Sequence, residues 1–253
     1  MSTLLERDPS LAATHSLAGP IQGWLTEREG QFLSQAACAC SANLAIVEIG
    51  SWKGKSTVWL GRGSQHGQRA KVYAIDPHTG SPEHQIDGGH VWTFDEFCAN
   101  IGAAGIEDVV APIVATSETA AATWQQPIGL LFIDGAHEYA DVRRDFDLWT
   151  PWLIDGGLLV MHDTTSCFRE SLPAWPGPRR VVRESVLGSH CFRAAGIVDS
   201  ITYATKRHEN TPGDRIQMLV LNLSRRLPDV AYLRVWPRLT PRQRQFVRRI
   251  CRL

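Results

Sequence analysis

The chain has 253 residues, of which 43% are hydrophobic and 21% are charged. This length and composition allow a full hydrophobic core, which excludes a disordered protein and favours one α/β domain with additions over two equal domains. The 26 basic and 26 acidic residues balance, yet residues 206–253 hold twelve Lys or Arg against three Asp or Glu, so an acidic body precedes a basic tail.

No export signal or membrane span is visible in the sequence. The N-terminus lacks a charged start followed by an apolar core, and no apolar run approaches the roughly 20 residues that a span needs. The six cysteines show no Cys-x-x-Cys spacing. Cys38 and Cys40 lie in an Ala-rich helical stretch, which favours buried thiols over a metal site. We therefore expect a reduced, cytoplasmic protein.

The predicted elements alternate between helices and strands. Residues 1–20 are interpreted as a flexible lead-in, and Thr26 with Glu29 has the spacing of a capping box that starts a helix. Strands are predicted at 44–50, 71–76, 109–116, 128–134 and 156–163, and helices follow at 55–67, 93–103 and 138–150. Alternation of this kind predicts an α/β, Rossmann-like, doubly wound and mostly parallel sheet, whose ligands bind beyond the carboxyl ends of the strands.

The C-terminal part predicts a helix at 176–189, a late strand at 201–206 and a basic amphipathic helix at 239–253. The main domain is placed at 21–205 and a basic C-terminal extension at 206–253. Three tryptophans, Trp149, Trp152 and Trp175, are expected to pack in the core.

The stretch "VEIGSWKGKST" predicts a ligand-binding turn after the first strand. Its glycines permit close backbone approach, and the following helix start offers unpaired N–H groups. The Gly-x-x-x-Gly spacing is neither a dinucleotide fingerprint nor a phosphate loop. Asp76 ends the second strand, where its carboxylate can accept from two ribose hydroxyls. A tight turn and a helix cap are the plainer alternative, but the pair favours a nucleoside ligand. The candidate residues are Glu48, Gly50, Ser51, Gly54, Ser56 and Asp76.

A second polar group lies at the ends of the next two strands. Asp134 closes the fourth strand, His162 and Asp163 close the fifth, and His137 sits one turn beyond Asp134. Carboxylates at one sheet edge suit a hard divalent cation such as Mg²⁺. A metal lowers the pKa of an oxygen that it binds, and His137 can then act as general base. The alternative is that these residues cap turns and helices.

These motifs resemble the class I S-adenosylmethionine-dependent methyltransferases over about residues 25–205. The resemblance implies that Glu48 and Gly50 hold the methionine part of the donor and that Asp76 holds its ribose. For the adenine, it points to Thr116 or Ser117 after the third strand. Asp134 also borders the expected donor site.

The pattern "FIDGAHEY…DFDLWTPWLIDGGLLVMHDT" narrows the resemblance to metal-dependent O-methyltransferases of natural-product sugars. It is similar to the macrocin and mycinamicin enzymes and to the group named after cephalosporin hydroxylase. The resemblance implies that Asp134 and Asp163 hold Mg²⁺ or another divalent cation and that His137 is the base. His162 replaces the first acid of the family's acidic pair, so the third ligand is His162, Thr164 or water.

The leading hypothesis is methylation of a hydroxyl on a sugar, an oligosaccharide or a glycosylated small molecule. One alternative is a metal-dependent, hydroxylase-like enzyme; another is a module that binds a polymer or membrane surface through the basic tail. An acidic body is a poor footprint for nucleic acid, so no nucleic acid partner is expected. A loop with His84, His90 and Trp92 follows the second strand and can cover an acceptor. A homodimer is a hypothesis based on the terminal helix.

Overall fold

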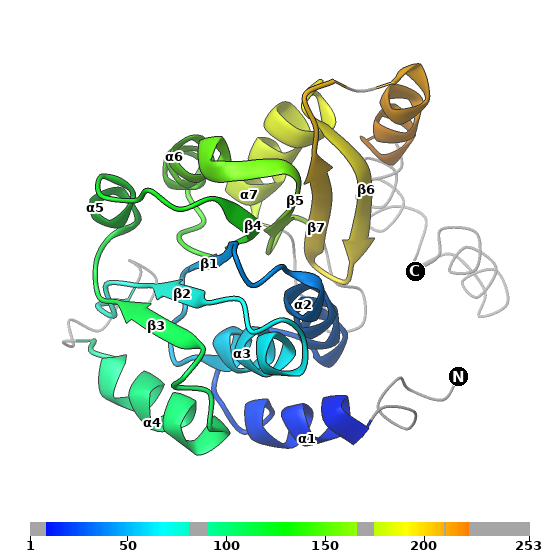
Figure 1. Ribbon diagram of the computed structural model, residues 1–253. Helices are drawn as coiled ribbons and strands as arrows, with labels where there is room; N and C mark the ends of the chain where they lie inside the picture. Colours follow the sequence, from blue (N-terminus) through cyan, green and yellow to red (C-terminus); the bar gives the residue numbers. More distant parts are fainter. Residues whose placement is uncertain (1–8, 81–90, 166–174, 210, 223–253) are drawn as a thin grey trace, which may run out of the picture.

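The computed structural model describes residues 9–80, 91–165, 175–209 and 211–222 (Figure 1). These residues form a seven-stranded sheet with the strand order β3-β2-β1-β4-β5-β7-β6. The strands are β1 (Ala45–Ile49), β2 (Val72–Ile75), β3 (Val110–Ile113), β4 (Ile128–Ile133), β5 (Leu153–Met161), β6 (Phe192–Val198) and β7 (Ile201–Lys206). Neighbours among β1–β5 run parallel, whereas β7 is antiparallel to β5 and β6. The predicted mostly parallel, doubly wound fold is confirmed.

Helices cover both faces of this sheet. They are α1 (Pro9–Ala18), α2 (Glu27–Ala39), α3 (Lys55–His66), α4 (Phe94–Ala104), α5 (Ser117–Ala121), α6 (Tyr139–Trp149) and α7 (Pro176–Val181), with a 3₁₀ turn at Thr150–Trp152 and a π-helical turn at Val182–Leu187. Residues 212–222 are also helical. Figure 1 shows α1–α4 on one side of the sheet and α5–α7 on the other.

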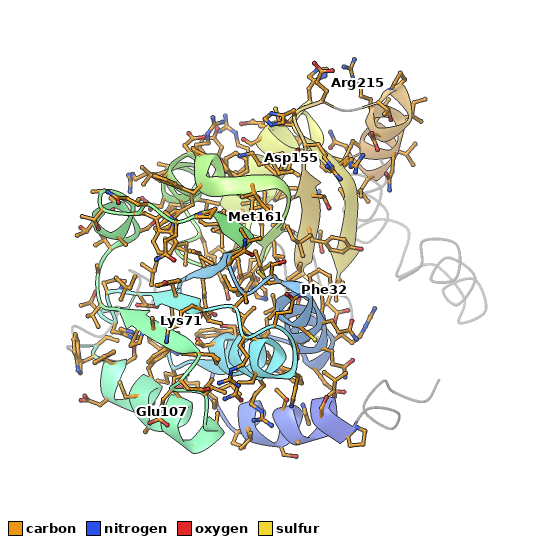
Figure 2. All side chains as sticks on the ribbon, viewed as in Figure 1. Phe32, Lys71, Glu107, Asp155, Met161 and Arg215 are labelled. Atoms are coloured by element: carbon orange, nitrogen blue, oxygen red, sulfur yellow. The ribbon has the colours of Figure 1, made fainter. Side chains whose placement is uncertain are left out.

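Side chains of the central strands alternate between two hydrophobic clusters. Figure 2 shows side chains filling the space between the sheet and the helices around it. In β1, Ile46 packs with Leu33 of α2 and Trp59 of α3, whereas Val47 packs with Phe146 of α6. Successive strand residues point to opposite faces, so a strand covered on both sides must be apolar throughout. This is why the central strands have near-continuous apolar sequences.

The capping box at the start of α2 is confirmed. The Thr26 hydroxyl accepts from the Glu29 backbone N–H at 3.2 Å, and the Thr26 N–H donates to Glu29 Oε2 at 2.8 Å. Helix α3 ends at His66, close to the predicted end, and the N–H of its C-cap residue Gly67 donates to carbonyl groups of the last turn.

Three parts of the chain differ from the sequence prediction or lie outside the described residues. The lead-in contains helix α1, which buries Leu11, Thr14 and Ala18, so residues 9–18 are not a loose segment. Strand β6 was not predicted, because its Ala and Gly content is low in β-propensity. The predicted basic helix at 239–253 lies outside the described residues, as do His84 and His90.

Among the helices in the described part of the chain, none combines the length and the apolar composition that crossing a bilayer requires.

Gly63 sits where α3 packs against α2, and a β-carbon there would clash with the backbone of Ser34. We expect Gly63→Ala to lower the free energy of unfolding by about 1–3 kcal/mol, the usual cost of overpacking. Urea denaturation measures this change. Gly102→Ala is the matched control in α4, because its β-carbon would meet only Glu107 Oε1 at 3.5 Å. It should be neutral or stabilise by up to about 1 kcal/mol, since Ala favours the helix. Equal losses in both variants would contradict the packing argument.

Candidate active site

The turn between β1 and α3 lies against the end of β4. Gly50 and Gly54 have φ values of 87° and 89°, in the region that glycine adopts without strain. A β-carbon on Gly50 would clash with the Asp134 carbonyl group. Gly50 therefore allows the backbones at the ends of β1 and β4 to touch, which brings the two predicted groups of site residues together.

Asp76 holds this turn in place from the end of β2. Its Oδ2 accepts the Trp52 backbone N–H at 2.7 Å, and its Oδ1 accepts the His78 N–H at 2.6 Å. Trp52 and His78 both have positive φ, so the two bonds fix strained residues. Each carboxylate oxygen keeps further acceptor capacity. The predicted contact of Asp76 with ribose hydroxyls stays a prediction.

Several buried polar atoms beside this turn have no hydrogen-bond partner within the described residues. They are Glu48 Oε1, Ser51 Oγ and His78 Nε2. Unsatisfied groups of this kind are costly in an interior and are usually paired with a ligand, water or ion. The polar ends of β1 and β2 therefore suit a bound polar molecule.

Glu48 is fully buried, and burial raises its pKa to about 8. The hydroxyls of Ser56 and Thr57 oppose this shift, and the nearby charges of Asp134 and Asp76 add to it. Thr57 Oγ1 donates to Glu48 Oε2 at 2.5 Å. Glu48 is therefore largely protonated at neutral pH until a cation approaches it.

Ser117 begins α5, and its hydroxyl accepts from the Trp149 indole N–H at 2.8 Å. This bond ties α5 to α6. The side chain is thus engaged inside the fold, and the predicted adenine contact at Ser117 stays a prediction.

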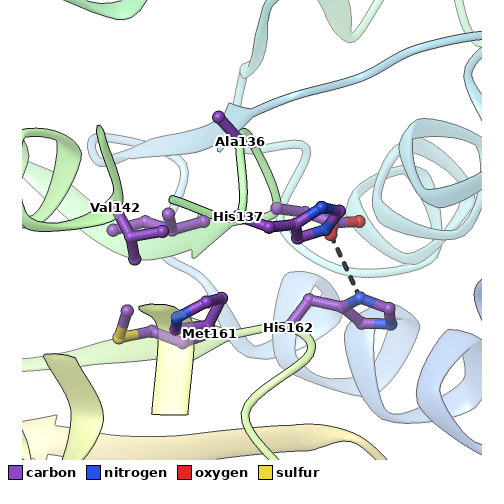
Figure 3. Close-up of a pocket in the computed structure, with 9 residues that line it drawn as sticks. Ala136, His137, Val142, Met161 and His162 are labelled. Carbon is purple, nitrogen blue, oxygen red and sulfur yellow. Dashed lines mark ion pairs between the residues drawn. The ribbon is translucent and has the colours of Figure 1, made fainter. Parts of the chain in front are cut away.

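Asp134, His162 and Asp163 meet as a triad at the ends of β4 and β5. One potential ligand atom from each lies within 4.8 Å of the others. His162 Nδ1 is 3.1 Å from Asp134 Oδ1, the pair marked in Figure 3, and 3.3 Å from Asp163 Oδ2. Of the three candidates for the third ligand, His162 faces the acids. Thr164 turns away, since its hydroxyl donates to the Ser200 carbonyl oxygen at 2.9 Å.

The other ring nitrogen of His162 faces a residue that sequence reasoning did not assign to the site. His162 Nε2 lies 3.4 Å from Glu29 Oε2 and 3.1 Å from Ser200 Oγ. Glu29 is fully buried, and its Oε1 accepts the N–H and the hydroxyl of Ser200, both at 2.7 Å. The capping box was the only local signal at Glu29, and it gives no indication of this contact.

The acids around His162 decide its charge. Burial alone would lower the pKa of His162, but Asp134, Asp163 and Glu29 raise it well above its usual range. For the acid Asp134, burial raises the pKa. Burial acts in the same direction on Asp163, but hydrogen bonds and charge from His137 and His162 hold the pKa of Asp163 below its usual range. The cluster therefore binds positive charge, which His162 supplies where no other cation is present.

His137 lies beside the triad and is held from two sides. Its Nε2 is 3.0 Å from Asp163 Oδ2, and its ring stacks on Trp175 with centroids 4.3 Å apart and planes 4° apart. Trp175 is 41% exposed, so the prediction that it packs in the core is wrong. The Trp175 backbone N–H donates to the Asp163 carbonyl oxygen at 3.1 Å, and this bond places the indole ring next to the acids. Trp149 is buried as predicted.

A small hollow of about 10 Å³, room for about one water molecule, adjoins the triad (Figure 3). Its lining consists of Ile133, Asp134, Gly135, Ala136, His137, Val142, Met161, His162 and Pro178. Its polar lining comes from Asp134, His137 and His162, and the remaining lining residues are apolar.

Residues 47–164 match a protein family described as a methyltransferase domain. The fold is similar to cofactor-bound Rv0187 from MTB, with 23% identity, a TM-score of 0.57, and coverage of 83% of this chain and 94% of that chain. It is also similar to the O-methyltransferase TomG from Streptomyces achromogenes in complex with SAM, with 18% identity, a TM-score of 0.54, and coverage of 79% and 90%.

The O-methyltransferase from Bacillus cereus in complex with SAH gives a TM-score of 0.53 at 18% identity, covering 79% of this chain and 91% of that chain. At these identities the likeness establishes the fold, and the family match covers the strands whose ends carry the site residues. The chain therefore has a fold similar to that of the class I methyltransferases, and residues 47–164 match a methyltransferase domain.

Proposed function

We propose that the protein transfers a methyl group from S-adenosylmethionine to a hydroxyl of a sugar or glycosylated small molecule, with a divalent cation and a histidine base. The observation that carries this proposal is the position of Asp134. Its carbonyl group abuts Gly50 in the turn after β1, and its carboxylate belongs to the triad with His162 and Asp163. A donor at the turn and an acceptor at the triad would thus be neighbours.

The donor half of the site has the charge and the unsatisfied groups that the donor needs. S-adenosylmethionine carries a positively charged ammonium and a positively charged sulfonium group. Glu48, Asp76 and Asp134 end three neighbouring strands, and Glu48 and Ser51 each have a buried atom without a partner among the described residues. Pairing with a cation relieves the cost of burying acids.

The triad fits a divalent cation. Asp134 and Asp163 supply oxygen ligands, and His162 supplies Nδ1, which lacks a hydrogen-bond partner within the described residues. When bound, the cation supplies Lewis acidity that makes a substrate hydroxyl easier to deprotonate. His137 donates from Nε2 to Asp163 Oδ2 and stacks on Trp175, so its other ring nitrogen takes the hydroxyl proton. The acceptor oxygen forms the new bond to the methyl carbon, and the bond from that carbon to sulfur breaks.

Trp175 supports a sugar as the acceptor. Its ring is partly exposed and parallel to His137, so a flat apolar surface lies beside the proposed base. Aromatic side chains offer large apolar faces against which the C–H face of a sugar ring packs. An acceptor that packs against the exposed part of Trp175 would lie near His137.

Calorimetric titration with S-adenosylhomocysteine, with and without Mg²⁺ or Mn²⁺, tests the proposed donor. We expect saturable binding of one molecule per chain, followed by methyl transfer in a screen of glycosylated acceptors. Absence of binding under all conditions would contradict the proposal.

His137→Ala should reduce kcat by about 10²–10⁴-fold, the usual contribution of a general base. It should leave affinity for S-adenosylhomocysteine unchanged, because His137 is assigned to the acceptor side. Trp175→Ala should mainly raise the KM for the acceptor. Steady-state kinetics together with donor calorimetry separates these effects. Full turnover in His137→Ala would show that His137 is not the general base.

Donor binding should release a proton near neutral pH. Because the folded pKa of Glu48 is about 8, its carboxyl group is about nine-tenths protonated at pH 7, and an ammonium bound beside it favours the ionised form. We expect calorimetry of S-adenosylhomocysteine in phosphate and in Tris at pH 7 to show release of up to about one proton per molecule bound. The release should fade above pH 9 and vanish in Glu48→Gln. An unchanged release in that variant would assign the proton to another group.

A further inference from the structure

We infer that Glu29 is a positioning residue that fixes the tautomer of His162, so that the cation site has a nitrogen ligand and prefers a first-row transition metal such as Mn²⁺ or Co²⁺ over Mg²⁺. The inference rests on the proposed cation site and deepens it. It concerns a residue of α2 that lies 133 residues before His162 in the sequence and meets it only in the folded chain.

The hydrogen bonds around His162 Nε2 identify the nitrogen that carries the proton. Ser200 Oγ donates its own proton to Glu29 Oε1, so toward His162 this oxygen can only accept. Glu29 Oε2, 3.4 Å from the same nitrogen, is also an acceptor. With two acceptors beside it, Nε2 must be the N–H, and the lone pair of the neutral ring lies on Nδ1.

Nδ1 points at the triad. It lies 3.1 Å from Asp134 Oδ1 and 3.3 Å from Asp163 Oδ2 and has no hydrogen-bond partner with good geometry among the described residues. Histidines that bind metals commonly donate their other N–H to a carboxylate, which sets the tautomer and the ring orientation. Glu29, His162 and the triad acids have this arrangement.

Glu29 is held rigidly enough for such a role. Its carboxylate accepts the Thr26 N–H within α2 and the Ser200 N–H and hydroxyl from the turn between β6 and β7. The side chain is fully buried. It therefore cannot rotate away from His162 as a surface carboxylate would.

A nitrogen ligand alters the choice of metal. Mg²⁺ prefers oxygen ligands and dehydrates reluctantly, whereas the affinity of a site with nitrogen and oxygen ligands for first-row divalent ions rises from Mn²⁺ to Co²⁺. A site in which His162 stands beside Asp134 and Asp163 should therefore discriminate against Mg²⁺.

The test is a titration with Co²⁺, followed by its visible absorption, on the full chain. The wild type should bind Co²⁺, and a hundredfold excess of Mg²⁺ should not displace it. Glu29→Gln should weaken Co²⁺ by about 10–100-fold, because the amide can donate to Nε2 and move the ring proton to Nδ1. Mn²⁺ binding followed by electron paramagnetic resonance provides an independent readout.

Asp199→Asn is the matched control. Asp199 joins the same junction, accepting from Thr26 Oγ1 and from Arg28 Nη1, both at 2.8 Å, and Asn tolerates its positive φ. The proposed role of Glu29 does not depend on the Asp199 carboxylate, so the Co²⁺ affinity of Asp199→Asn should stay at the wild-type value. An equal loss of Co²⁺ affinity in both variants would show that Glu29 has only a structural role. A Glu29→Gln variant with wild-type Co²⁺ affinity would also overturn the inference.

Two further results would overturn it. One is displacement of Co²⁺ by Mg²⁺ at equal concentration, and the other is absence of any metal binding by the wild type, which would leave His162 as the cation of the cluster. Titration of the same samples with S-adenosylhomocysteine separates this inference from the proposed function. A chain that binds Co²⁺ but no donor contradicts the function alone. One that binds the donor but no metal contradicts the inference and the proposed cation, and it leaves the proposed donor in place.

Discussion

Buried acids at the carboxyl edge of the sheet are the constraint on which the other features of this site depend. A carboxylate removed from water is stable only if it is paired or hydrogen-bonded, or if it stays protonated. Glu29 is paired and hydrogen-bonded through His162 and Ser200, and Glu48 stays protonated. The same need for positive charge that organises His162 and His137 makes this edge suitable for a cationic donor and a metal.

The edge is divided into two halves that share Asp134. On one side, Asp76 fixes the glycine turn through backbone N–H groups, which leaves polar atoms at the ends of β1 and β2 available to a ligand. On the other side, His162 and Asp163 surround the position proposed for the cation. Gly50 keeps the two halves close together, since any side chain at this position would force the ends of β1 and β4 apart. Proximity of two reactants is a large part of catalysis in transfer reactions, and this contact would provide it in the proposed reaction.

Elements outside the central strands complete the site. Helix α2 contributes Glu29, the turn between β6 and β7 contributes Ser200, and the segment before α7 contributes Trp175. Each adds a contact that restricts a histidine, through hydrogen bonds to His162 and through stacking on His137. The histidines are thus oriented by parts of the chain that carry none of the recognised motifs.

The sequence by itself determined the alternating fold and most of the strand ends, because apolar runs covered on both faces and capping residues are local signals. It also indicated Asp134, His137, His162 and Asp163, since side chains that follow neighbouring parallel strands meet at one edge of the sheet. Helix α1 and strand β6 were not predicted, because their patterns are weak and they form by packing against the rest of the fold.

Only the tertiary structure decided which partners these residues have. Glu29 has the sequence signature of a helix cap, and nothing near it in the chain indicates that Ser200 and His162 lie against it. Trp175 was expected in the core because large aromatic residues are usually buried, yet it stacks on His137 at the surface. Contacts between residues far apart in the chain depend on how the layers pack, and a local pattern carries no information about that packing.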